Sequence, residues 1–174
     1  MLFTKRDQPS FNPHAHTRDD SLAASGPPHS VLTIMDCDDE GRSLEEIFHH
    51  LGWQHHRCRS VQQALLVLRK HTVSAILVDN KFFVVAGRVI LDAARQPAYS
   101  PKLILVHRFS EGPTAGKSMN GGAFHWIWKP FRKDEVRAAL GFALMQCQRE
   151  WERYLRESRF AARAAGTPSG SDGG

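Results

Sequence analysis

The sequence predicts an α/β fold in which helices cover both faces of a five-stranded parallel sheet. Two observations carry this prediction. Short apolar runs alternate with segments of helical periodicity between residues 30 and 146, which is typical of a parallel sheet with crossover helices. Polar residues follow several of these runs directly, as expected where buried strands end. Because crossover connections are right-handed, we expect the doubly wound strand order 2-1-3-4-5.

The five expected strands are short and differ in polarity. The runs 31–35 and 75–78 are the clearest buried strands, because each is a continuous apolar stretch followed by an aspartate. The run 53–58 is the most polar, so we expect it at an edge of the sheet. The remaining two strands are expected at residues 103–106 and 124–128.

Helical signals fill the intervals between the strands. Asp38 or Asp39 can cap a first helix, and Gly52 can end it. Ser60 can cap a second helix with one apolar face. The range 87–95 predicts a third helix.

The last part of the chain predicts a helix that is longer than one domain requires. The glycines in the range 113–122 allow only a short, weak fourth helix. A helical pattern then extends from about Asp134 to Ala165. It carries a short heptad-like seam, which favours a partner helix or a second copy of the chain. The seam consists of Leu140, Leu144, Cys147, Trp151, Tyr154 and Ser158.

Composition predicts one cytoplasmic domain with polar tails. We expect residues 1–29 and 166–174 to be disordered, 30–146 to form the domain, and 147–165 to be a helical extension. The net charge of +5 is spread along the chain, so a nucleic-acid partner is not expected. No run approaches the ~18 apolar residues of a membrane span. The three cysteines lie far apart, as in a reduced cytosolic protein.

The strand-end motifs resemble those of response-regulator receiver domains. Val31–Asp36 is similar to the family's first strand, and Ser74–Asp79 to its third. Gly122–Phe131 is similar to the family's GA…KPF ending, and Gly87 matches a family glycine. The resemblance implies a flavodoxin/CheY-like fold and a stand-alone, non-enzymatic role in phosphorelay (two-component) signalling. It also implies a histidine kinase or phosphotransfer protein as one partner and a downstream protein as another.

The resemblance further implies a role for each residue at the expected strand ends. Asp79 would be the phosphoacceptor, and Asp36 would bind Mg²⁺ together with it. Asp38 is a further candidate ligand. Lys129 would pair with Asp79 and then with a phosphoryl oxygen. The switch positions would be Trp126 and either His107 or Val106, of which His107 keeps the family spacing to Lys129.

The chain departs from the family pattern at several of these positions. Met35 stands where the family has the first acid of its acid pair, and Phe83 stands where proline is usual. Neither His107 nor Val106 has the hydroxyl group expected at the end of the fourth strand. These departures support an alternative: a phosphorylation-independent pseudo-receiver that acts as a scaffold or dimerisation module.

Two other chemical interpretations of the sequence have less support. The first is a small α/β enzyme that uses Asp36, Asp79 and Lys129, although no glycine-rich cofactor loop follows the first strand. The second is a metal site formed by the four histidines in the range 49–56. Adjacent histidines at a helix–strand turn point in different directions, so surface positions are the simpler expectation.

Overall fold

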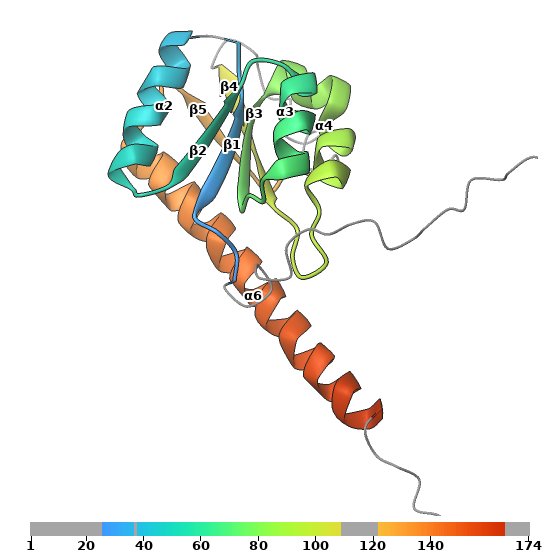
Figure 1. Ribbon diagram of the computed structural model, residues 1–174. Coiled ribbons are helices and arrows are strands. Elements are labelled where there is room, and N and C mark those ends of the chain that lie inside the picture. The colour runs from blue at the N-terminus through green and yellow to red at the C-terminus, as the bar shows by residue number, and fades with distance from the viewer. Residues whose placement is uncertain (1–25, 37, 109–121, 166–174) are drawn as a thin grey trace, which may run out of the picture.

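The computed structural model describes residues 26–36, 38–108 and 122–165. Its centre is an all-parallel sheet with the order β2-β1-β3-β4-β5, which confirms the predicted topology (Figure 1). The strands are β1 (Ser30–Ile34), β2 (Gln54–Cys58), β3 (Ala75–Asp79), β4 (Lys102–Arg108) and β5 (His125–Lys129). The short helix predicted at 113–122 falls almost wholly outside the described residues.

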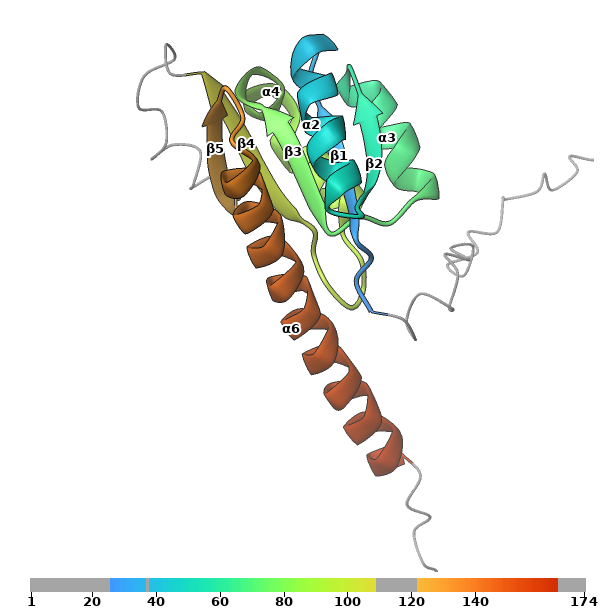
Figure 2. The same ribbon diagram turned by 90° about the vertical axis from the view of Figure 1, so that its left-hand side faces the viewer.

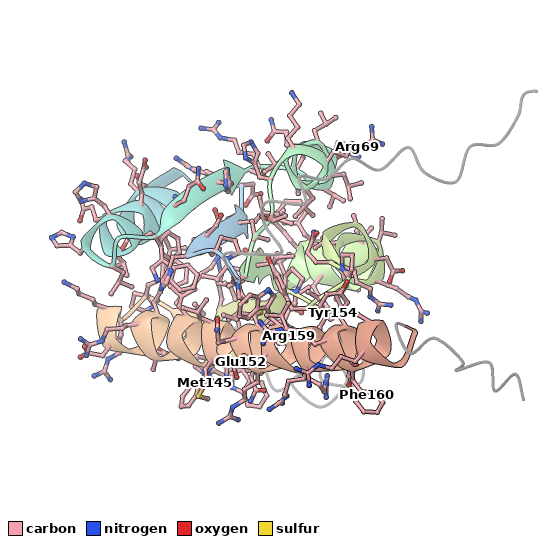
Figure 3. The ribbon with its side chains drawn as sticks, turned by 60° about the horizontal axis from the view of Figure 1, so that its bottom comes forward. Arg69, Met145, Glu152, Tyr154, Arg159 and Phe160 are labelled. Atoms are coloured by element: carbon pink, nitrogen blue, oxygen red, sulfur yellow. The ribbon has the colours of Figure 1, made fainter. Side chains whose placement is uncertain are left out.

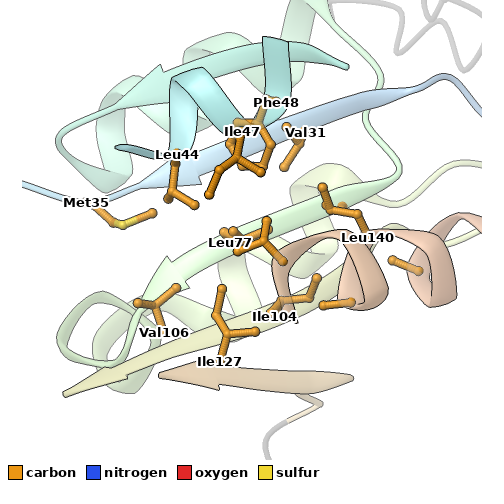
Figure 4. Close-up of a cluster of buried hydrophobic side chains, with 14 residues drawn as sticks. Val31, Met35, Leu44, Ile47, Phe48, Leu77, Ile104, Val106, Ile127 and Leu140 are labelled. Atoms are coloured by element: carbon orange, nitrogen blue, oxygen red, sulfur yellow. The ribbon is translucent and has the colours of Figure 1, made fainter. Parts of the chain in front are cut away.

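Helices cover the two faces of the sheet in two layers (Figures 1 and 2). The layer on one face is formed by α2 (Asp38–His50) and α6 (Lys133–Ala165), and the other by α3 (Val61–Lys70) and α4 (Asn80–Ala94). Side chains alternate along each strand, so β3 contributes to both cores. Leu77 meets Phe48 and Leu140 beneath α2 and α6, as Figure 4 shows. Ile76 lies on the other face, in the core beneath α3 and α4.

Two predicted signals at helix ends are present in the structure. The Ser60 hydroxyl caps α3 by accepting a hydrogen bond from the Gln63 N–H at 3.3 Å. Gly52 follows α2 with a φ of +68°. A side chain would be strained in this left-handed conformation, which glycine adopts without penalty. Both signals depend only on neighbouring residues, and this is why the sequence reveals them.

The start of α4 was predicted wrongly. The helix begins at Asn80, directly after β3, instead of at Gly87. Asp79 is its N-cap, and the Asp79 carboxylate accepts a hydrogen bond from the Lys81 N–H at 3.4 Å. Aromatic and β-branched residues fill the range 82–85 and have modest helix propensity. The helix propensity of these residues therefore does not predict the first turns of α4, which the Asp79 cap and the packing of the helix stabilise.

Phe83 contributes to that packing. Its side chain lies in the core beneath α3 and α4 and is only 8% exposed. The ring also lies over Gly87, where an added Cβ would come within 2.4 Å of the Phe83 ring. The phenylalanine that replaces the family proline is thus matched to a glycine one turn later.

The long helix α6 is confirmed, and it leaves the sheet about halfway along its length (Figure 2). Its first half packs on the sheet through Val136, Leu140 and Cys147, all at most 1% exposed. Most residues after Glu150 are exposed. The packed part therefore continues past Gln146, where the domain was expected to end. No helix in the described ranges has the length and apolar character of a membrane span.

Glu150 connects the last packed turn of α6 to residues at the start of β4 by two hydrogen bonds. One carboxylate oxygen accepts a hydrogen bond from Lys102 Nζ at 2.6 Å, and the other accepts one from the Ser100 N–H at 2.9 Å. Burial raises the pKa of Glu150. The hydrogen bonds from Lys102 and Ser100 lower it, and on balance the pKa lies below its ordinary value. Glu150 is therefore held as a carboxylate at neutral pH.

We expect Glu150→Ala to lower the free energy of unfolding by about 1–3 kcal/mol, because Lys102 loses its partner in a partly buried position. The matched control is Glu152→Ala on the exposed side of the same helix, which should change stability by less than about 0.5 kcal/mol. Urea denaturation at neutral pH measures both. Equal effects of the two substitutions would contradict the assigned role of Glu150.

The effect of Glu150→Ala should also depend on pH. A lowered folded-state pKa gives stability that is present above the ordinary value of 4.5 and is lost as the pH falls through the folded pKa. The difference in unfolding free energy between wild type and variant should therefore shrink under acidic conditions. A difference that stays constant into strong acid would show that it does not arise from the carboxylate charge.

Candidate functional site

The carboxyl edge of the sheet brings two of the predicted site residues into direct contact. Lys129 Nζ donates a hydrogen bond to Asp79 Oδ2 at 2.8 Å. Both side chains are only 8% exposed. Isolated charges are strongly disfavoured at such burial, and this pair places an opposite charge beside each group. The other oxygen, Oδ1, accepts the long hydrogen bond from the Lys81 N–H and no other from the residues that the structure describes.

Asp36 follows β1 at the same edge and forms a second ion pair. Its carboxylate contacts the ammonium of Lys81, and both side chains are about half exposed. The hydrogen bond from Lys81 lowers the pKa of Asp36, burial raises it, and the positive charge of Lys129 lowers it again, with a net decrease. Asp36 therefore lies within electrostatic reach of Lys129.

Lys81 is a site residue that sequence reasoning missed. The prediction left it in a loop, because the third helix was expected to begin at Gly87. Its signal in the sequence is a lysine two positions after Asp79, in the first turn of a helix that Asp79 caps. Such a position directs a long side chain back across the strand ends toward Asp36.

The side chain of Met35 is not part of the site. Its side chain is 2% exposed and belongs to the core beneath α2 and α6, together with Leu44 and Val106 (Figure 4). Its backbone N–H donates to the Cys58 carbonyl at 3.0 Å. The position where the family has an acid therefore contributes to stability here and provides no ligand.

The two candidates for the hydroxyl position lie on opposite faces of the sheet. Val106 is paired in register with Asp79, but its side chain packs in the core beneath α6. His107 is 2% exposed, and its ring lies 5.6 Å from that of Trp128. Strand alternation places it on the α3–α4 face, which the partly buried Trp126 also occupies. Their roles as switch residues stay predictions.

The described donors at this edge fit a magnesium ion poorly. Mg²⁺ prefers an octahedral set of oxygen ligands that includes carboxylates. Asp36 and Asp79 are the two carboxylates described at this site, and each is paired with a lysine. Among the residues that the structure describes, no group of three or more histidines, cysteines or acids could hold a metal. The side chain of Asp38 lies outside the described part.

Three histidines of the range 49–56 each contact a different local group, and the His49 ring lies against that of His50. His55 Nε2 lies 2.8 Å from Thr33 Oγ1, and burial lowers the pKa of His55 to about 4. His50 donates to the Glu46 carbonyl at 2.6 Å. The His56 ring lies 4.5 Å from that of His71. The described part of the chain therefore offers no histidine metal site here.

Comparison with known proteins places this geometry in a known fold. No protein-family model matches the chain. The regulatory protein AtoC of Escherichia coli (strain K12) is 26% identical over 129 residues, which cover 74% of this chain and 28% of AtoC. The chain thus spans little more than a quarter of the length of that relative.

Solved structures of receiver domains are similar over most of the domain. The receiver domain of TorR has a TM-score of 0.60 at 18% identity and covers 69% of this chain and 99% of its own. The receiver domain of the sensor histidine kinase PA1611 from Pseudomonas aeruginosa PAO1, which coordinates a magnesium ion in its active-site cleft, has a TM-score of 0.57 at 17% identity, covering 67% and 98%. The chain has the fold of CheY-like receiver domains.

We expect Lys129→Met to lower the free energy of unfolding by about 3–5 kcal/mol, because the buried Asp79 carboxylate loses its countercharge. Adding Asp79→Asn to this variant should restore part of the loss, since the buried charge is removed. The exposed Lys133 supplies the control Lys133→Met, expected to be near neutral. Chemical denaturation measures all three. A cost below ~1 kcal/mol for Lys129→Met would indicate a pair exposed to water in solution.

Proposed function

We propose that this chain, which has the receiver-domain fold, works in two-component signal transduction as a phosphoacceptor and protein-interaction module. The observation that carries the proposal is the buried pair between Asp79 and Lys129 at the carboxyl edge of a 2-1-3-4-5 sheet. Parallel sheets of this kind form their sites at that edge. In the proposal, a histidine kinase or phosphotransfer protein supplies the phosphoryl group.

The chemistry would use the two oxygens of Asp79 differently. The Lys129 ammonium holds Oδ2, and Oδ1 accepts only a long hydrogen bond among the described residues. Oδ1 is therefore the better nucleophile toward a phosphohistidine, whose P–N bond breaks as the O–P bond forms. Lys129 then neutralises a phosphoryl oxygen with its fixed positive charge. Magnesium is left out of this scheme because the described carboxylates fit it poorly.

A phosphorylation-independent scaffold is a second candidate that specific observations favour. Met35 is buried in the core instead of contributing an acid, and His107 has no hydroxyl group. The whole Asp79 residue, backbone included, is only 6% exposed, so a phosphodonor would have limited access to it. In this version the Asp79–Lys129 pair stabilises the sheet edge, and binding to partners gives the chain its function.

The output surface in either version would include the outer side of α6. Phe142 (56% exposed), Met145 (39%) and Phe160 (77%) lie open to solvent on it, and Figure 3 shows Met145 and Phe160 projecting from the helix. The predicted seam is only partly available, because Leu140 and Cys147 pack on the sheet. Its exposed remainder consists of Tyr154 and Ser158, whereas Trp151 is partly buried.

Labelling with a small acyl-phosphate donor, with and without magnesium, tests the phosphoacceptor. Wild-type protein should be labelled, and Asp79→Asn should abolish the label because it removes the nucleophile. Asp36→Asn should weaken the label, because Asp36 contributes to the charge balance of the site. Asp92→Asn, an exposed carboxylate on α4, is the control. Label that persists in Asp79→Asn would show that another residue is the acceptor. Unlabelled wild type, under conditions that label an intact receiver domain, would favour the scaffold.

Sedimentation at tens of micromolar tests self-association through the protruding half of α6. We expect a dimer for the wild-type chain and at least ~10-fold weaker association for Tyr154→Glu, because a carboxylate would enter an apolar contact. Arg156→Glu places the same charge elsewhere on the helix as a control. A wild-type chain that sediments as a monomer would leave a different protein as the partner of this surface.

A further inference from the structure

Lys81 contacts both aspartates of the site. Its side-chain ammonium pairs with the Asp36 carboxylate, and its backbone N–H donates to Asp79 Oδ1 at 3.4 Å. Asp36 and Lys81 are 45 residues apart in the sequence and meet only because β1 and β3 are neighbours. One residue therefore contacts both carboxylates, Asp36 through its ammonium and Asp79 through its backbone.

The fold holds the Lys81 ammonium over the site in two ways. The start of α4 at Asn80 puts Lys81 in the first helical turn, beside the Asp79 cap. The ammonium also lies 5.1 Å from the centre of the Phe82 ring, which adds a cation–π contact. This position is a consequence of the early helix start.

The charges of the described site balance without a metal. A receiver site with two acids, a phosphoacceptor aspartate, a lysine and a divalent cation sums to zero. Here Met35 removes one negative charge, and a lysine supplies one positive charge where a divalent cation would supply two. Asp36 and Asp79 are then matched by Lys81 and Lys129. An added divalent cation would give the site an excess of positive charge.

We propose that the Lys81 ammonium is the resident cation of this site and excludes a divalent metal from it. Lys81 is thus a specificity-determining residue: it keeps Asp36 and Asp79 in a metal-free, charge-balanced arrangement. The inference concerns the site of the proposed function but does not require Asp79 to be phosphorylated.

Calorimetric titration of the full chain with magnesium alone tests the inference. Wild-type protein should bind magnesium weakly or not at all. Lys81→Glu removes the competing charge and adds a third carboxylate, so it should bind magnesium at least ~100-fold more tightly than wild type. Lys70→Glu makes the same change at an exposed position at the end of α3 and should resemble wild type. Circular dichroism checks that each variant is folded.

Two results would overturn the inference. Wild-type protein that binds magnesium as tightly as Lys81→Glu would show that Lys81 excludes nothing. Failure of both proteins to bind would show that removal of the Lys81 ammonium does not admit the metal, so Lys81 is not what excludes it. Neither result depends on labelling of Asp79, so an unlabelled wild type would defeat the phosphoacceptor proposal and leave this inference standing.

Discussion

The ion pair between Asp79 and Lys129 is the interaction on which the rest of this sheet edge depends. It joins the ends of β3 and β5 across the intervening β4, and neither charge could be buried at this level alone. The same Asp79 carboxylate caps α4, which begins at the next residue. The start of α4 in turn brings Lys81 to Asp36. One buried carboxylate therefore organises two strands, one helix and a second ion pair.

The sequence predicted the strand order and the meeting of Asp79 with Lys129, because both follow from period and connection rules that act along the whole chain. It did not predict the start of α4. That start depends on the Asp79 cap and on the packing of Phe83 in the core, whereas the local propensity of residues 82–85 points elsewhere. Because the first turns of α4 were not predicted, Lys81 was placed in a loop and was left out of the predicted site.

Sequence comparison with the family pattern could show which groups are missing, but not what replaces them. Met35 and His107 are visible as departures from single positions. Only the packing shows that the Met35 side chain joins the core beneath α2 and α6, and that His107 lies against Trp128. Neither side chain brings an acid or a hydroxyl group to this edge of the sheet.

The site and the helix α6 are connected by very little chain. Lys129 ends β5, and only residues 130–132 separate it from the start of α6. Phe131 within this link packs against the same core as Leu140. Any change at Lys129 in the proposed function would therefore take place within a few residues of the start of α6. At its other packed end, Glu150 ties α6 to Lys102 and Ser100. The packed half of α6 is therefore attached to the sheet at both of its ends, and its protruding half continues from this fixed part.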